Sequence, residues 1–180
     1  MRELWGYLRL PRQDNYTIVN VPNLLGQHYL AIGADYETFY YTVETPGAQS
    51  YALNTHEYLH STVNPLAEAG FEAEEEKLNR WYEAGREGPY AASYQWGPTF
   101  VSECLVRALD YRLRLLGTED GEEISAIQGR VDDLSEGGLK LVRPFFDGLR
   151  DFEKGNLDFA EFVPVLFEQV SDPPPPPPGT

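Results

Sequence analysis

The segment His56-Glu57-Tyr58-Leu59-His60 constrains the fold of this chain more than any other feature of its sequence. Two histidines four residues apart lie on one face of an α-helix, where both imidazoles can bind a single zinc ion. Glu57 follows the first histidine, so its carboxylate can take a proton from a water molecule that the metal activates. The pattern is the H-E-x-x-H motif, and it contains two of the chain's three histidines. The alternative is a helix that carries two surface histidines at this spacing by chance.

A third metal ligand has to come from another part of the chain, because catalytic zinc sites generally take three protein ligands. His28 lies upstream of the motif, in an expected loop, and no histidine follows His60. Glu103 is the strongest candidate, since it lies among apolar residues on an expected helix, where a carboxylate needs a metal ion or a charged partner. Arg107, four residues further along, can hold this carboxylate or form an ordinary ion pair with it.

Two segments of the chain resemble the family catalogued as domain of unknown function 4932. They are HEYLHSTVNPL at residues 56–66 and ECLVRA at residues 103–108. Members of that family carry a similar H-E-aromatic-x-H-S-x-V-N-P segment and a later E-x-x-x-R-A helix, and they are regarded as zincin-like metallopeptidases. The resemblance covers residues 56–108, and it supports the fold and the metal site better than the substrate.

The resemblance implies a zinc peptidase of the gluzincin type. His56, His60 and Glu103 hold Zn²⁺ in this interpretation, and Glu57 is the general base. The segment 39–43 becomes the strand that borders the cleft, where an extended substrate can pair by backbone hydrogen bonds.

Such a site also needs a hydrogen-bond donor that stabilises a developing oxyanion. Tyr90 and Tyr94 lie in the polar loop before the expected helix of Glu103, and both carry a suitable hydroxyl. We take Tyr94 as the candidate catalytic tyrosine.

The order of the expected elements predicts an α+β fold. Segments 17–21 and 39–43 are rich in β-branched and aromatic residues, as strands are, and 29–33 could supply another strand. Helical patterns follow at 51–63, 66–83, 100–116, 122–129, 139–152 and 158–170, and Asn64-Pro65 is expected to end the first of them. The order predicts a small N-terminal β-sheet in residues 1–48 and helices in residues 49–172, and the family resemblance implies that this α+β fold is zincin-like.

Length and composition set the domain organisation. The 180 residues suit one catalytic domain over residues 1–172. Residues 173–180 contain a run of six prolines, which predicts a disordered tail outside the fold.

Charge and cysteine content exclude several classes of partner. The chain has 29 acidic and 14 basic residues, a net charge of −15, so nucleic acid and anionic membrane surfaces are poor partners, and no apolar run could span a membrane. Its one cysteine, Cys104, excludes an intrachain disulfide. A single cysteine and a start unlike a signal peptide favour the cytoplasm, whereas an additional N-terminal segment would favour secretion.

Two functions fit these observations. The first is a zinc metallopeptidase whose partner is a peptide or protein substrate. The second is a non-proteolytic binding or regulatory module that contains the metal and docks through the proline tail. Glu57 favours the first, because metal binding alone does not require it.

Overall fold

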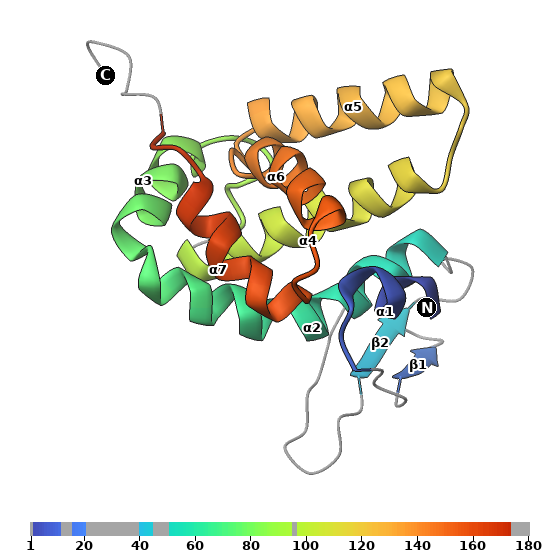
Figure 1. The fold of residues 1–180 in the computed structure, drawn as a ribbon. Coiled ribbons are helices and arrows are strands. Elements are labelled where there is room, and N and C mark those ends of the chain that lie inside the picture. Colours follow the sequence, from blue (N-terminus) through green and yellow to red (C-terminus); the bar gives the residue numbers. More distant parts are fainter. Residues whose placement is uncertain (1, 12–15, 21–39, 45–50, 95–96, 174–180) are drawn as a thin grey trace.

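The computed structural model describes residues 2–11, 16–20, 40–44, 51–94 and 97–173 (Figure 1). The elements, in chain order, are α1 (Arg2–Leu8), β1 (Tyr16–Asn20), β2 (Tyr40–Glu44), α2 (Tyr51–Ala73), α3 (Glu75–Gly85), α4 (Gly97–Leu116), α5 (Gly121–Glu136), α6 (Val142–Lys154) and α7 (Phe159–Gln169). The described residues are therefore mostly helical. The run of prolines after Pro173 lies outside them.

The expected α+β fold is wrong. Both predicted strands are present within one residue of their expected bounds, but they pair only with each other, in parallel, with Tyr16 opposite Tyr40. Two strands of five residues cannot form a layer that buries a core, since independent sheets need three or more strands. The segment 29–33, expected as a further strand, lies outside the described residues. The described part of the chain builds its core from helices instead, so the zincin-like sheet layer is not formed there.

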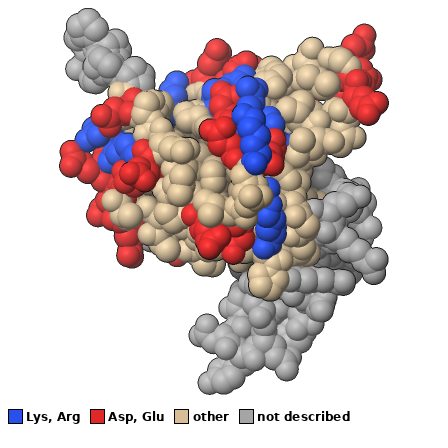
Figure 2. Space-filling model, viewed as in Figure 1, with Lys and Arg blue, Asp and Glu red and all other residues tan. Residues whose placement is uncertain are grey.

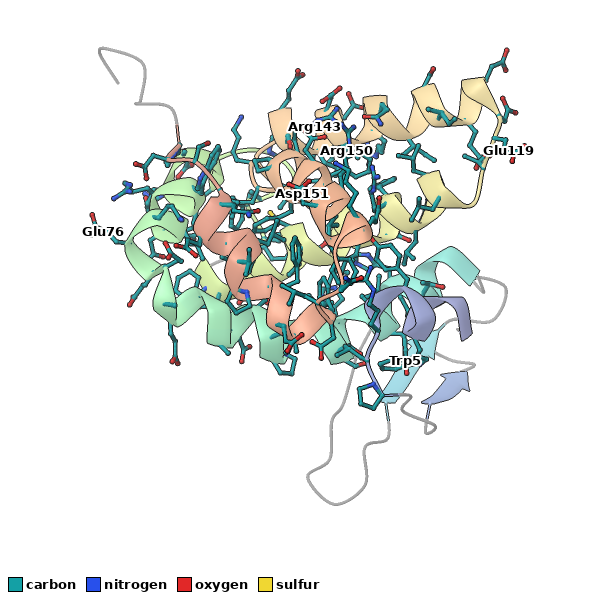
Figure 3. All side chains as sticks on the ribbon, viewed as in Figure 1. Trp5, Glu76, Glu119, Arg143, Arg150 and Asp151 are labelled. Carbon is teal, nitrogen blue, oxygen red and sulfur yellow. The ribbon has the colours of Figure 1, made fainter. Side chains whose placement is uncertain are left out.

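Residues expected as extended chain at the N-terminus form α1. Leu4, Trp5 and Leu8 recur at helical spacing, and all three are buried. The Trp5 ring, labelled in Figure 3, meets the Tyr58 ring of α2 edge-on at 5.8 Å. After the helix, Arg9 adopts a positive φ of 54° and donates hydrogen bonds to the carbonyl oxygens of Phe152 and Leu157. These contacts fix α1 against α2 and the end of α6.

α2 continues for 23 residues through Pro65, where the sequence predicted its end. Proline removes one backbone hydrogen bond from a helix and disfavours helical geometry in the residue before it. Here Pro65 is exposed, while Val63 and Ala67 on either side of it are fully buried. Packing of this buried face therefore outweighs the local preference of Asn64-Pro65 for a helix end.

The core of the described residues lies around α4. α2 and α4 run antiparallel along each other, α6 packs on α4, and α7 packs on α2 (Figure 1). Phe145 of α6 stacks on Phe167 of α7 with ring centroids 5.2 Å apart. α4 is buried along most of its length, including Cys104. A side chain on the first half of α4 is thus held firmly against α2.

On the face shown in Figure 2, acidic side chains form several separate patches, and Lys and Arg lie in a narrow central band and in a smaller group at the left. Arginines of α6 in this view are paired with neighbouring carboxylates. Arg143 binds Asp132 of α5, and Arg150 lies 3.5 Å from Asp147 (Figure 3). None of the helices that the structure describes is both long and apolar enough to cross a lipid bilayer.

Candidate metal centre

The histidines of the motif and Glu103 come together across the α2–α4 contact. His56 and His60 lie one helical turn apart on α2, and Glu103 lies on the facing surface of α4. All three are largely shielded from solvent, with side-chain exposures of 10%, 17% and 6%. The predicted spacing on one helix face therefore places both imidazoles beside the predicted carboxylate.

The distances between the ligand atoms suit one zinc ion. The Nε2 atoms of His56 and His60 are 3.3 Å apart. The Glu103 carboxylate lies 3.2 Å from Nε2 of His60 through Oε2, and 3.8 Å from Nε2 of His56 through Oε1. Ligand atoms about 2.0–2.1 Å from a tetrahedral zinc ion lie about 3.3 Å from one another. Two imidazole nitrogens and a carboxylate oxygen are also the donor set of many catalytic zinc sites, so the residues fit this metal.

The electrostatics of the cluster favour the ligating forms of His56 and Glu103. Burial lowers the pKa of His56 to about 4, despite the nearby Glu103 carboxylate. Burial alone would raise the pKa of Glu103, but the hydrogen bond from His60 and the charge of Arg107 outweigh it and lower that pKa to about 2. At neutral pH, His56 is therefore neutral and Glu103 is ionised, as metal binding requires.

Arg107 holds the Glu103 carboxylate from the side. Its Nε donates to Oε1 of Glu103 at 2.6 Å, one helical turn further along α4. Oε2, the other carboxylate oxygen, is the one that lies toward His60. The expected pairing at four-residue spacing is present, and it leaves Oε2 directed at His60.

The two tyrosines considered as oxyanion donors lie in different surroundings. Burial, followed by the negative charge of the neighbouring Glu103 carboxylate, raises the pKa of the Tyr94 hydroxyl. Tyr90 accepts a hydrogen bond from Arg130 of α5 at 3.3 Å, and the Arg130 guanidinium lies over its ring. Tyr94, and not Tyr90, is therefore in contact with the candidate centre.

The side chain of Glu57 lies outside the described part of the structure, and its role as general base stays a prediction. Its backbone belongs to α2, next to His56. β2, which includes most of the segment predicted to pair with substrate, contacts α2. The pairing with substrate stays a prediction too.

Asn64 is a neighbour of the cluster that the sequence did not single out. Its side-chain oxygen lies 3.0 Å from Nδ1 of His60, the ring nitrogen on the far side from the ligand position. The signal was present in the sequence, since Asn64 follows His60 by four residues. The expected helix end at Asn64-Pro65 concealed it.

Comparison with protein-family models, with curated proteins and with solved structures finds no match to this chain. The resemblance to the domain of unknown function 4932 therefore stays a prediction, and a function for this chain has to be inferred from the geometry of the centre.

Proposed function

We propose that the chain is a zinc-dependent hydrolase that cleaves peptide bonds. The observation that carries the proposal is the convergence of His56, His60 and Glu103 at ligand spacing. A chance pair of surface histidines would not account for a buried carboxylate from another helix that lies 3.2 Å from one imidazole nitrogen and 3.8 Å from the other while Arg107 pairs with it. The position of Glu57, directly after the first histidine, supports hydrolysis over metal storage.

In this proposal, one group of residues binds the metal and another residue transfers the proton. His56, His60 and Glu103 hold the ion, and Arg107 keeps the carboxylate in place. A bound zinc ion would supply a Lewis acid that makes water a nucleophile at neutral pH. Glu57 takes a proton from the attacking water and returns it to the leaving nitrogen. Tyr94, near Glu103, is the candidate donor to the developing oxyanion.

The test combines metal analysis with one conservative substitution. The purified chain is loaded with zinc, and its metal content and cleavage of a peptide mixture are measured by mass spectrometry. Glu57→Gln should bind zinc within a few-fold of the parent and lose about 10²–10⁴-fold in cleavage rate, because Gln cannot accept the proton. Glu68→Gln, on an exposed position of the same helix, serves as the matched control and should change neither.

Each adverse result points to a different conclusion. A parent chain that takes up no zinc would contradict the metal centre. Stoichiometric zinc without cleavage of any peptide would favour the non-proteolytic metal-containing module. Equal cleavage by Glu57→Gln and the parent would remove Glu57 from the mechanism.

A further inference from the structure

His60 is engaged at both ends of its imidazole ring. Nε2 lies 3.3 Å from Nε2 of His56 and 3.2 Å from Oε2 of Glu103, within the ligand set. Nδ1, on the opposite side, lies 3.0 Å from Oδ1 of Asn64. The contact with Asn64 therefore helps to fix the ring orientation from outside the cluster.

We propose that Asn64 is a positioning residue of the metal centre, which accepts a hydrogen bond from Nδ1–H of His60 and so directs Nε2 toward the ion. This inference rests on the proposed metal centre and deepens it. A neutral imidazole carries its proton on one nitrogen only, and the other nitrogen is free to bind a metal. Without zinc, Nε2 of His60 can donate its proton to Glu103; when zinc is bound, an acceptor at Nδ1 favours the tautomer in which Nε2 has the free lone pair.

The chemistry of the acceptor gives the expected magnitude. Histidines that bind metals commonly donate their second ring N–H to a carboxylate, a carbonyl oxygen or water, and losing that acceptor costs about 10–100-fold in metal affinity. The amide oxygen of Asn64 supplies such an acceptor without adding charge. Loss of this oxygen should therefore weaken zinc binding by about that factor while His56, His60 and Glu103 remain in place.

Asn64 lies beside Nδ1 of His60 because α2 continues past residue 64. Since α2 runs unbroken to Ala73, residues 56, 60 and 64 follow one another on the same face at successive turns. Asparagine is a weak helix former, so a helix interior position gains nothing from it unless its side chain has a partner. In this chain the partner is Nδ1 of His60.

The experiment measures zinc affinity by competition with a chromogenic chelator, which needs no enzymatic activity. Asn64→Ala should bind zinc about 10–100-fold more weakly than the parent. Asn64→Asp should bind within a few-fold of the parent or more tightly, because a carboxylate also accepts from Nδ1–H. Asn156→Ala, at an exposed position between α6 and α7, is the matched control and should leave the affinity unchanged. Rescue by Asp separates positioning of the ring from a merely structural effect on the helix.

A second measurement avoids substitution altogether. Proton–nitrogen NMR of the zinc-loaded parent reports which ring nitrogen of His60 carries the proton, and the proposal expects it on Nδ1. A proton on Nε2 would overturn the proposal, as would Asn64→Ala that binds zinc as tightly as the parent. If the parent binds no zinc, both this inference and the proposed function fail. If the parent binds zinc and only the Asn64 results disagree, this inference fails alone.

Discussion

Replacing Glu103 by Gln tests the electrostatics of the centre in the metal-free protein. The substitution keeps the shape of the side chain and mimics the protonated carboxyl group. The surroundings lower the pKa of Glu103 from 4.5 to about 2. One pKa unit corresponds to about 1.36 kcal/mol, so ionised Glu103 contributes about 3 kcal/mol to the free energy of unfolding. Glu103→Gln should lose about this amount at pH 7.

The loss should depend on pH in a defined direction. A carboxyl group whose pKa is depressed in the folded state stabilises the protein above its unfolded pKa, and the contribution disappears as the pH falls through the folded value. The difference between parent and Glu103→Gln should therefore be full above about pH 4.5 and shrink toward pH 2. Urea unfolding of chelator-treated protein, followed by circular dichroism between pH 7 and pH 3, measures it.

The same variant tests the role of Glu103 as a ligand. Zinc at 100 times its dissociation constant stabilises a folded protein by about 2.7 kcal/mol. The parent should show such a gain, whereas Glu103→Gln should bind zinc more than about tenfold more weakly and gain correspondingly less. Glu68→Gln, exposed on α2, should change the free energy of unfolding by less than about 0.5 kcal/mol. A difference between parent and Glu103→Gln that stays below about 1 kcal/mol, or that does not vary with pH, would refute the assignment of a stabilised carboxylate.

Three further substitutions test how the surrounding helices are held. A Cβ on Gly85 would lie 2.0 Å from a carbonyl oxygen in the turn between α5 and α6, so Gly85→Ala should lower the free energy of unfolding by about 3 kcal/mol. Gly129 lies in open space on α5, so Gly129→Ala should raise the free energy of unfolding by about 0.5–1 kcal/mol. Thermal unfolding of both variants and the parent measures these changes. The Glu153 carboxylate pairs with Arg112 and accepts a hydrogen bond from the Tyr7 hydroxyl of α1. Glu153→Gln should therefore lower the free energy of unfolding by about 2 kcal/mol and speed amide hydrogen exchange in α1. Unchanged exchange in α1 would contradict this anchoring.

The composition of the candidate centre could be predicted because each step depends on local chemistry. Four-residue spacing places His56 and His60 on one face of any helix, whatever the rest of the fold. Glu103 stood out because it is a carboxylate among apolar neighbours, and the structure places it across from those histidines. That these residues bind zinc stays a prediction, since spacing and burial do not by themselves identify an ion.

The fold class could not be predicted in the same way. Strand preference located β1 and β2 correctly, but it says nothing about how many strands pair or whether a sheet covers the core. Helix α1 was not predicted, because seven residues are too few to show a clear helical period. Its apolar residues are buried through packing on α2 and α6. Pairing partners and packing surfaces are set by tertiary contacts, which no local pattern in the sequence contains.

Pro65 links the wrongly predicted end of α2 to Asn64, the residue missed in the candidate centre. A proline predicts a helix end from local backbone sterics alone, and that rule separated Asn64 from the helix of the histidines. Burial of Val63 and Ala67 against neighbouring helices keeps the backbone helical on both sides of the proline, whose ring faces solvent. Because the helix continues, Asn64 reaches Nδ1 of His60, and a row of three polar side chains forms where the sequence predicted two. A helix broken at Asn64 would leave that ring nitrogen without this acceptor, so the packing that overrides the proline also shapes the candidate metal centre.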